Sequence, residues 1–237
     1  MGRFISSIII FSFFSALLFG IHYGAYYLLT RQNKLVVTNV FIKGNNFVSA
    51  EQIKKACGFG SSTGIFDFNL TDAASSIKEN PLIEDVEINR FPPDIVLIKV
   101  KERTPLSVVV DSGKNAYLTD KNGYVISKGY LAGIPVIYLD YPVRYEKNSI
   151  NDDFVKILLK KLEEFKGTKE IRQIQVKRKE GIYIVIKGLE KVLFFIGKNI
   201  PDNTLFNRIE SIAMRIRKEN INTRFIYVSK ENAIGYK

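Results

Sequence analysis

Few residues in this sequence could act as nucleophiles, general bases or metal ligands in the usual combinations. Among its 237 residues are a single histidine, His22, and a single cysteine, Cys57. A lone cysteine excludes an internal disulfide and a metal site built from several cysteines. A lone histidine excludes a cluster of histidine ligands, and we expect no serine–histidine–aspartate triad. The composition therefore argues against several large classes of enzyme.

The most enzyme-like spacing is Ser75-Ser76-Ile77-Lys78. It matches the Ser-x-x-Lys of penicillin-recognising enzymes, and on a helix the lysine could reach the serine hydroxyl. Serine and lysine are both common in this chain, so such a match arises readily by chance. No Lys-Thr-Gly follows, and the nearest string is Lys166-Gly167-Thr168. We interpret the match as coincidence.

The remaining reactive groups have simpler interpretations. Asp152-Asp153 and Glu163-Glu164 are adjacent carboxylates, but their places at the start and in the middle of a predicted helix suit the helix dipole and solvation. Cys57 is expected to be a small buried hydrophobic residue, because no histidine is available to activate it. The sequence therefore predicts no catalysis, no metal and no cofactor.

The chain is basic, with 35 lysines and arginines against 24 acidic residues and a net charge of +11. Such an excess suits nucleic acid, an anionic membrane surface or an acidic protein partner. Nucleic acid is not favoured, because lysines alternate with glutamates, as in residues 160–164 (KKLEE), which is typical of a solvated helix face. A basic surface without one particular ligand and an acidic protein partner both remain open.

Residues 4–30 form an uninterrupted uncharged run. As a helix the run would extend about 40 Å, more than the roughly 30 Å of a bilayer core. Tyr23, Tyr26 and Tyr27 lie near its far end and suit a membrane interface. We predict a transmembrane anchor within residues 1–34. A cleaved signal peptide is the alternative, but the apolar run is long for one and no clear cleavage site follows.

Residues 35–103 indicate a small domain with the order β-α-α-β-β. A strand is predicted at 35–42, and a capping box at residues 49–52 (SAEQ) opens a helix that ends near Gly58. A second helix carries Leu70, Ala73, Ala74 and Ile77 on one face and stops before Pro81. Two strands follow, at 83–89 and 95–101.

Four segments of this region resemble the POTRA domain of the bacterial cell-division proteins FtsQ and DivIB. They are residues 40–45 (VFIKGN), 80–86 (NPLIEDV), 90–93 (RFPP) and 101–105 (KERTP). In that family one transmembrane helix is followed by POTRA and then by a β-rich domain. The resemblance therefore implies the same order here. Almost no residues precede the apolar run, in contrast to the cytoplasmic tail of many members.

Residues 104–237 are rich in predicted strands, with two helices, at about 154–165 and 205–216, and no internal repeat. Weak motifs of the family occur in the expected order: residues 117–123 (YLTDKNG), 195–197 (FIG), 221–225 (INTRF) and 233–236 (AIGY). The fold class is α+β: an N-terminal transmembrane helix, a POTRA domain, then a mixed β-sheet domain with two or more helices. We predict the divisions 1–34, 35–103 and 104–237.

The resemblance implies a non-enzymatic, membrane-anchored scaffold of the bacterial divisome. Its partners would be FtsB/DivIC and FtsL, which are small single-span proteins, with the septal peptidoglycan synthase as a further candidate. The chain would be a single-pass type II protein of the inner or cytoplasmic membrane at the division septum, with its C-terminal domains extracytoplasmic. Counting positive charges on the two sides of the helix does not settle this orientation.

We place the partner-binding site at the C-terminal strand. A strand at the end of a chain often forms a sheet edge, where unpaired backbone groups can accept another strand. The resemblance agrees, because strand addition at this place is expected for the family. The predicted site residues are Arg224, Phe225, Ala233, Ile234, Gly235 and Tyr236. Arg224 matches a family arginine that would face an acidic residue of the partner.

Two other functions remain as alternatives. A POTRA domain also suits a chaperone-like factor in outer-membrane or secretion assembly, but that would require a barrel of alternating strands after it. The second alternative is an extracytoplasmic cell-wall enzyme, and this hypothesis depends on the Ser75–Lys78 spacing alone.

Overall fold

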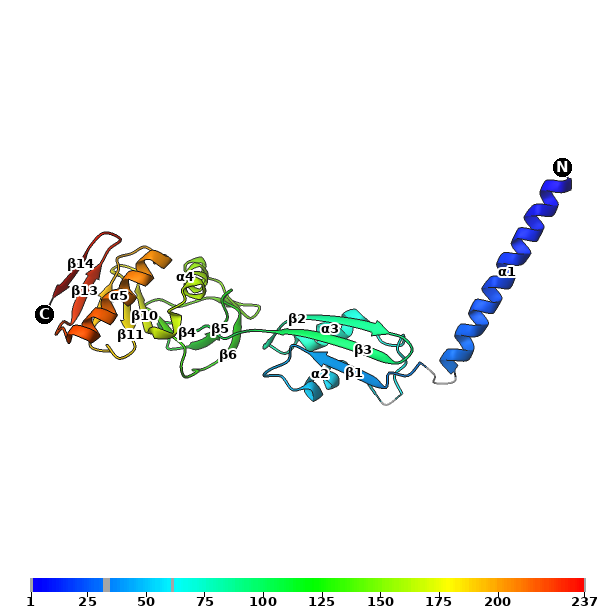
Figure 1. Cartoon of the computed structure of the whole chain (residues 1–237), viewed down its shortest axis with the longest axis horizontal. Helices are drawn as coiled ribbons and strands as arrows, with labels where there is room; N and C mark the ends of the chain where they lie inside the picture. Colours follow the sequence, from blue (N-terminus) through cyan, green and yellow to red (C-terminus); the bar gives the residue numbers. More distant parts are fainter. Residues whose placement is uncertain (1, 32–34, 61, 237) are drawn as a thin grey trace. The chain divides into compact units, whose positions relative to one another are not determined.

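The computed structural model describes residues 2–31, 35–60 and 62–236, with side chains at 8–28, 35–60 and 62–235. Its internal contacts divide the chain into two compact units, Met1–Glu102 and Arg103–Lys237 (Figure 1). The predicted fold class, α+β, is confirmed: an apolar N-terminal helix, a small domain with the order β-α-α-β-β where the POTRA domain is expected, and a large mixed sheet with helices. The three-part division of the chain at residues 34 and 103 stays a prediction.

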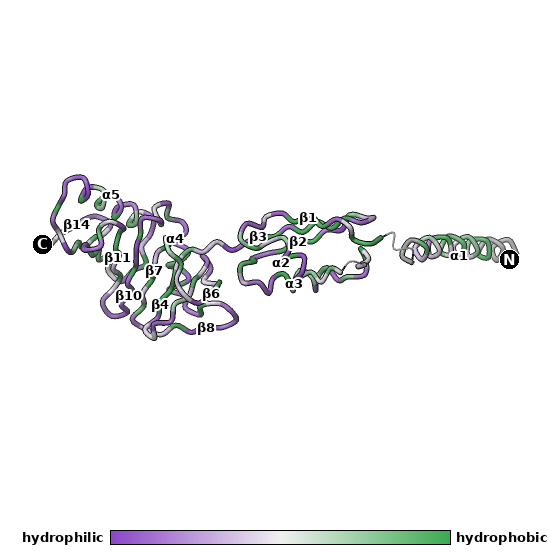
Figure 2. The backbone as a smooth tube through the Cα atoms, turned by 90° about the horizontal axis from the view of Figure 1, so that it is seen from below, coloured by the Kyte–Doolittle hydropathy of each residue, from purple (hydrophilic) through white to green (hydrophobic). Residues whose placement is uncertain are grey.

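The first helix, α1, covers Gly2–Arg31. Its segment Ile8–Leu28 is long and apolar enough to cross a membrane, and none of it is buried within the protein. Figure 2 shows hydrophobic residues along much of this helix. A helix satisfies its own backbone hydrogen bonds, which is what a segment in lipid needs. The length and composition of α1 therefore suit a membrane anchor.

The POTRA domain contains five elements in the predicted order. They are β1 Asn39–Lys43, α2 Ala50–Ala56, α3 Leu70–Lys78, β2 Ile83–Phe91 and β3 Ile95–Glu102. The strands form one sheet in the order β1-β3-β2, with β1 parallel and β2 antiparallel to β3. The predicted capping box of α2 is confirmed, because Ser49 and Gln52 exchange side-chain and backbone hydrogen bonds.

The predicted start of the first strand, at residue 35, is wrong by four residues. Residues 35–37 pair instead with the loop before α3: the Val37 amide donates to the Thr63 carbonyl at 2.9 Å, and the Ile65 amide to the Leu35 carbonyl at 2.7 Å. Apolar composition alone cannot separate a sheet strand from an extended segment that pairs with a loop. The sheet itself begins where Asn39 comes opposite Ile95.

The core of the domain lies between the two helices and one face of the sheet. Its buried members are Val48, Ile53, Cys57, Ile65, Ile77, Ile83, Val96, Ile98 and Val100. Burial raises the pKa of the Cys57 thiol to about 11, so this group is a neutral thiol at physiological pH. Cys57 is a buried packing residue, as predicted for a cysteine without a histidine to activate it.

The second unit is built on a nine-stranded sheet with the order β14-β13-β12-β11-β10-β7-β4-β5-β6. Its strands are β4 Ser107–Val110, β5 Ala116–Thr119, β6 Val125–Lys128, β7 Val136–Leu139, β10 Ile171–Lys177, β11 Gly181–Ile186, β12 Leu193–Phe195, β13 Phe225–Val228 and β14 Ala233–Tyr236. The pairs β4–β7, β7–β10 and β12–β13 are parallel, and the others are antiparallel.

Two helices contribute to the core of this unit. Helix α4, Asp153–Glu164, buries Val155, Leu158, Leu159 and Leu162, and α5, Asn203–Glu219, buries Leu205, Phe206, Ile209, Ala213 and Ile216. Asp152 caps α4 by accepting from the Val155 amide at 2.9 Å, which is the structural role expected for this acidic pair. A short 3-10 turn, Thr168–Glu170, and a hairpin of β8 Tyr145–Glu146 and β9 Ser149–Ile150 complete the unit.

A buried ion pair stabilises the N-terminal part of the second unit. The Arg103 guanidinium lies 2.7 Å from Asp120 Oδ2, and the two side chains are 14% and 5% exposed. The same guanidinium stacks on the ring of Tyr124 at 3.6 Å, and Asp120 Oδ1 accepts from the Asn122 and Tyr124 amides. Asp120 therefore closes the β5–β6 turn and binds the segment that leads into β4. Asp120 is the acidic residue of the motif at 117–123 (YLTDKNG), and these contacts are its structural role.

Replacing Asp120 by alanine should lower the free energy of unfolding of the second unit by about 3 kcal/mol, because it leaves a buried guanidinium without its carboxylate. Glu163→Ala is the matched control: Glu163 pairs with Lys121 at 3.0 Å, but both side chains are nearly half exposed, so a loss of at most about 1 kcal/mol is expected. Urea unfolding of the full chain in detergent measures both. Equal losses would show that the Arg103–Asp120 pair does not stabilise the unit.

Candidate partner-binding edge

The C-terminal strand β14 lies at one edge of the nine-stranded sheet. It pairs antiparallel with β13, so that Tyr227 is opposite Ile234 and Ile226 is opposite Gly235. Within the described part of the chain, no strand pairs with the other side of β14. One row of its backbone amides and carbonyls is therefore available to a further strand. Figure 1 shows β13 and β14 together beside α5.

The two faces of this edge differ in what they pack against. Ile226 and Val228 of β13 are buried in the core, and opposite them β14 places only Gly235 and Ala233. On the other face Tyr227 is 38% and Ile234 is 50% exposed. Small residues face inward and larger apolar ones outward, so β14 contributes little to the core and much to the surface.

An aromatic row leads across the sheet to this edge. The register places Tyr183 of β11 opposite Phe195 of β12, Phe195 opposite Tyr227, and Tyr227 opposite Ile234. The ring centroids are 4.9 Å apart for Tyr183–Phe195 and 5.8 Å for Phe195–Tyr227, and Phe225 also stacks on Phe195 at 6.1 Å. We call Tyr183, Phe195, Phe225 and Tyr227 the aromatic row. A strand added to β14 would extend the outer surface that this row begins.

Helix α5 holds the turn between β13 and β14. The Arg208 guanidinium donates to the backbone carbonyls of Lys230 and Glu231, the latter at 2.9 Å. Lys230 Nζ lies 2.7 Å from Asp202 Oδ2, and this lysine lowers the pKa of the Asp202 carboxyl. Ser229 and Asn232 close the turn through their backbones at 2.8 Å. The edge strand is therefore positioned by α5 as well as by β13.

The structure brings most of the predicted site residues together. Ala233, Ile234 and Gly235 lie in β14 beside Phe225 of β13, and Tyr236 is in the same strand, although its side chain lies outside the described residues. Arg224 is exposed, its carbonyl accepts from the Leu193 amide at 2.9 Å, and its side chain forms no ion pair among the described residues. That these residues bind a partner stays a prediction.

Sequence reasoning missed Tyr183, Phe195, Tyr227 and Arg208 as parts of this edge. The alternation of Phe225 and Tyr227 about buried Ile226 is a readable period-two signal. Phe195 and Tyr183 join the row only through the sheet order, which the sequence does not reveal. Arg208 is half-buried and donates to a turn more than twenty residues away in the sequence, which no local pattern indicates.

The Ser75–Lys78 spacing does not form a catalytic pair. Ser75 is exposed on α3, and Lys78 Nζ lies 2.6 Å from Asp85 Oδ1. Hydrogen bonding to Lys78 lowers the pKa of Asp85, so the lysine is engaged as a cation by a carboxylate. In this arrangement it is a poor base for the serine. Among the residues described, no group of three or more His, Cys, Asp or Glu could hold a metal ion.

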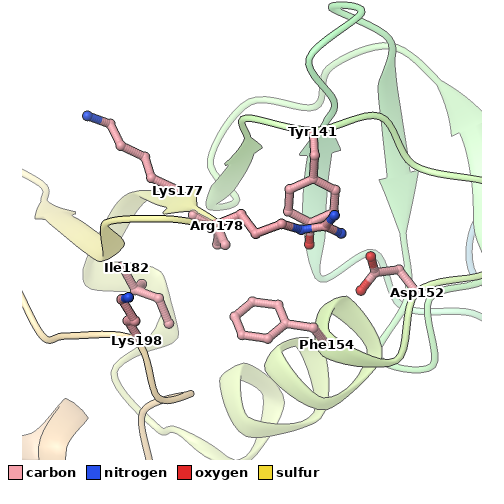
Figure 3. A pocket seen from close by; sticks show the side chains of 9 residues that line it. Tyr141, Asp152, Phe154, Lys177, Arg178, Ile182 and Lys198 are labelled. Carbon is pink, nitrogen blue, oxygen red and sulfur yellow. The ribbon is translucent and has the colours of Figure 1, made fainter.

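A pocket of about 180 Å³ lies beside α4 and β10 (Figure 3). The Arg178 guanidinium lies over the Tyr141 ring at 4.1 Å, with Phe154 on the opposite wall. Burial and the nearby Asp152 raise the pKa of Tyr141 to about 12, so its phenol keeps its proton near neutral pH. The pocket combines cations with aromatic surface, and the carboxylate that lines it, Asp152, is engaged in capping α4.

Removing the Arg208 side chain should loosen the edge without unfolding the unit. A hydrogen bond from a charged donor contributes about 1.5–3 kcal/mol, so in Arg208→Ala the β14 amides should exchange roughly tenfold faster or more. Arg215→Ala is the control, because the Arg215 side chain lies on the same helix, is 72% exposed and forms its ion pair, among the described residues, with Glu219 of that helix. Hydrogen exchange of the full chain measures both. Equal rates at β14 in the two variants would contradict the role given to Arg208.

Comparison with known proteins supports the expected resemblance. Residues 35–103 match the family described as POTRA domain, FtsQ-type. The chain is 26% identical over 192 residues to the cell division protein DivIB of Clostridium tetani, which covers 77% of this chain and 70% of that protein. It is 32% identical over 123 residues to DivIB of Staphylococcus aureus, covering 52% and 27%, and 30% identical over 102 residues to FtsQ of Rickettsia bellii, covering 43% and 38%.

The match therefore spans less than two thirds of the Staphylococcus and Rickettsia proteins. The names of these relatives support a role in cell division and agree with a protein that is not an enzyme. In the sequence the matched residues come after α1, which is the one helix among the described residues that is long and apolar enough to cross a membrane. The chain thus carries an FtsQ-type POTRA domain behind one N-terminal apolar helix and is similar to the bacterial cell-division proteins FtsQ and DivIB.

Proposed function

We propose that this chain is a non-enzymatic, membrane-anchored scaffold of the divisome that recruits FtsB/DivIC, and through it FtsL, to the septum. The observation that carries this proposal is the open edge of β14 next to the aromatic row. The cell-division names of its relatives support the process, and the edge supports a mode of binding. Localisation and recruitment, rather than chemistry, would be its contribution to division.

Strand addition at β14 accounts for both affinity and specificity. Backbone hydrogen bonds along the free side of β14 would supply affinity without regard to sequence. Ile234 and the adjoining Tyr227 would provide the apolar surface that selects alternate side chains of the incoming strand. Tyr236 would add an aromatic anchor. The inward face of β14, which carries only Ala233 and Gly235, leaves the added strand free of steric conflict with the core.

Arg224 provides the electrostatic part of the recognition. It is exposed immediately before β13, so its guanidinium can reach beyond the edge to an acidic residue of the partner. A guanidinium binds a carboxylate through two parallel hydrogen bonds, which fixes orientation as well as charge. The partner is therefore a short strand that carries one carboxylate and alternating apolar residues, which is the chemistry we assign to the FtsB/DivIC segment.

The anchor and the two folded units together define the arrangement that we propose. The amino terminus lies in the cytoplasm, α1 crosses the membrane once, and the POTRA domain and the sheet domain lie outside at the septum. The septal peptidoglycan synthase is a further partner within the same assembly. No observation favours the assembly-factor alternative, since the second unit is an open sheet that ends in β14 and β6.

The test is capture of the extracytoplasmic segment of FtsB/DivIC by the full chain in detergent. Arg224→Glu and Ile234→Asp should each weaken capture about tenfold or more, because each removes an interaction at the centre of the interface. The matched controls are Arg215→Glu and Met214→Asp on α5, at 72% side-chain and 55% residue exposure, which should capture normally. A reversal of the partner's acidic residue to lysine should restore capture by Arg224→Glu.

Three results would count against the proposal in distinct ways. No capture by the unsubstituted chain would contradict the partner. Normal capture by both folded β14 variants would place the binding site elsewhere on the scaffold. Failure of the charge reversal to restore capture would remove the assigned role of Arg224 and leave the strand addition to be judged from Ile234→Asp.

A further inference from the structure

One face of the POTRA sheet is left open. The inward side chains of β3, Val96, Ile98 and Val100, are buried beneath α2 and α3, which lie on the same side of the sheet (Figure 2). On the other face, Phe41 of β1 is 54% exposed and Phe91 of β2 is 50% exposed. These two large aromatic side chains belong to the outer strands β1 and β2, on the face opposite to the buried side chains of β3.

The strand register divides this open face into two halves. Near the start of β1, Phe41 is opposite Leu97, and Ile95 is opposite Phe91. We call Phe41, Phe91, Ile95 and Leu97 the apolar end. Toward the other end of β3 the face becomes charged: Lys99 is opposite Lys43 and pairs with Glu87, and Lys101 pairs with Glu84. The polarity of the face thus changes along the strands.

The apolar end is the end at which the chain arrives from α1. Helix α1 ends at Arg31, and β1 begins at Asn39, which is opposite Ile95. Eight residues of extended chain reach at most about 28 Å. If α1 spans the bilayer, the apolar end cannot be farther than this from the end of the helix. A contact with the membrane would then be intramolecular, which favours even a small apolar surface.

The charge around this end complements an anionic lipid surface. Arg31 and Lys34 are basic and belong to the segment of sequence that leads to this end, and no acidic residue precedes Glu51 in the sequence. The carboxylate of Asp94 also lies at this end, where it accepts hydrogen bonds from the side chains of Thr38 and Asn39. Basic residues close to a membrane-spanning helix are attracted to anionic headgroups, and aromatic rings insert at the level of the headgroups. An anionic lipid surface accounts for both the basic residues and the position of the apolar end, because α1 keeps that end close to the membrane. Binding of an acidic protein would not require the apolar end to lie close to α1.

We propose that the apolar end of the POTRA sheet docks on the anionic lipid surface of the membrane that holds α1, with Phe41 and Phe91 at the headgroup level. Docking fixes the orientation of the POTRA domain relative to the bilayer. A short tether alone would restrict its distance from the membrane but not its orientation. This contact is independent of the β14 edge and of the partner assigned to it.

Tryptophan fluorescence gives a direct test, because the chain contains no tryptophan. Phe41→Trp and Phe91→Trp are made separately in the full chain and reconstituted in vesicles of phosphatidylcholine and phosphatidylglycerol with or without brominated acyl chains. The control is Phe47→Trp: Phe47 is 73% exposed, and its amide donates to the Glu102 carboxylate at the far end of β3. That end lies about 23 Å along the strand from Ile95.

Brominated lipid should reduce the emission of tryptophan at 41 and 91 about twofold, while tryptophan at 47 should keep its emission. In vesicles of phosphatidylcholine alone the quenching at 41 and 91 should weaken, because the anionic headgroups are absent. Far-UV circular dichroism identifies any variant that fails to fold, and the two positions provide independent readings. Equal quenching at all three positions, or none at 41 and 91, would overturn the proposal.

Discussion

The second unit depends on a continuous row of buried side chains that crosses its sheet. Following the register from strand to strand, the row consists of Tyr117, Val109, Ile137, Ile174, Ile184, Phe194 and Ile226. Each of these side chains is 8% exposed or less. Because strand side chains alternate between faces, a shift of one residue in β7, β10 or β13 would move its member of the row to the more exposed face of the sheet. The row therefore favours one register in these strands, whereas β4 and β11 are buried on both faces.

The properties of the proposed binding edge depend on the place where this row of buried side chains ends. It continues to Gly235 in β14, which has no side chain to add to the core, so the last strand is held by its backbone ladder and by the contacts of α5 with the turn. The strict alternation then places Phe195, Tyr227 and Ile234 on the opposite face. An edge that adds little to the core but carries an apolar outer surface is suited to accept a strand. The same alternation in the POTRA sheet buries Ile98 and exposes Phe41.

Much of the fold could be predicted from local sequence signals. The uncharged run, the capping box at Ser49 and the alternation around Ile226 are all features that a few neighbouring residues determine. The strand Val136–Leu139 was not predicted, although it joins the two halves of the large sheet. Its residues (VIYL) are all apolar, so the sequence shows no alternation of polar and apolar side chains, although in the sheet Ile137 and Leu139 are buried and Tyr138 is 38% exposed. The contact of Arg208 with the turn between β13 and β14 could not be predicted either, because the two are more than twenty residues apart in the sequence.

The sequence allowed us to predict which residues of the candidate edge lie near one another, but not the side chains that surround them. The strand at Ala233 and the neighbouring Phe225 could be placed from the end of the chain and from the family resemblance. The aromatic row could not, because Tyr183 and Phe195 reach the edge only through the sheet order. Short-range pattern gave the elements, whereas long-range pairing determines which side chains share a surface.

The central claim is that β14 accepts a strand of the partner, and hydrogen exchange of the full chain with and without the FtsB/DivIC extracytoplasmic segment tests it most directly. New backbone hydrogen bonds should slow exchange of the outward amides of β14 by about tenfold or more, while β6 at the opposite edge of the same sheet should be unchanged. Unchanged exchange along β14 while the segment is demonstrably bound would contradict the account.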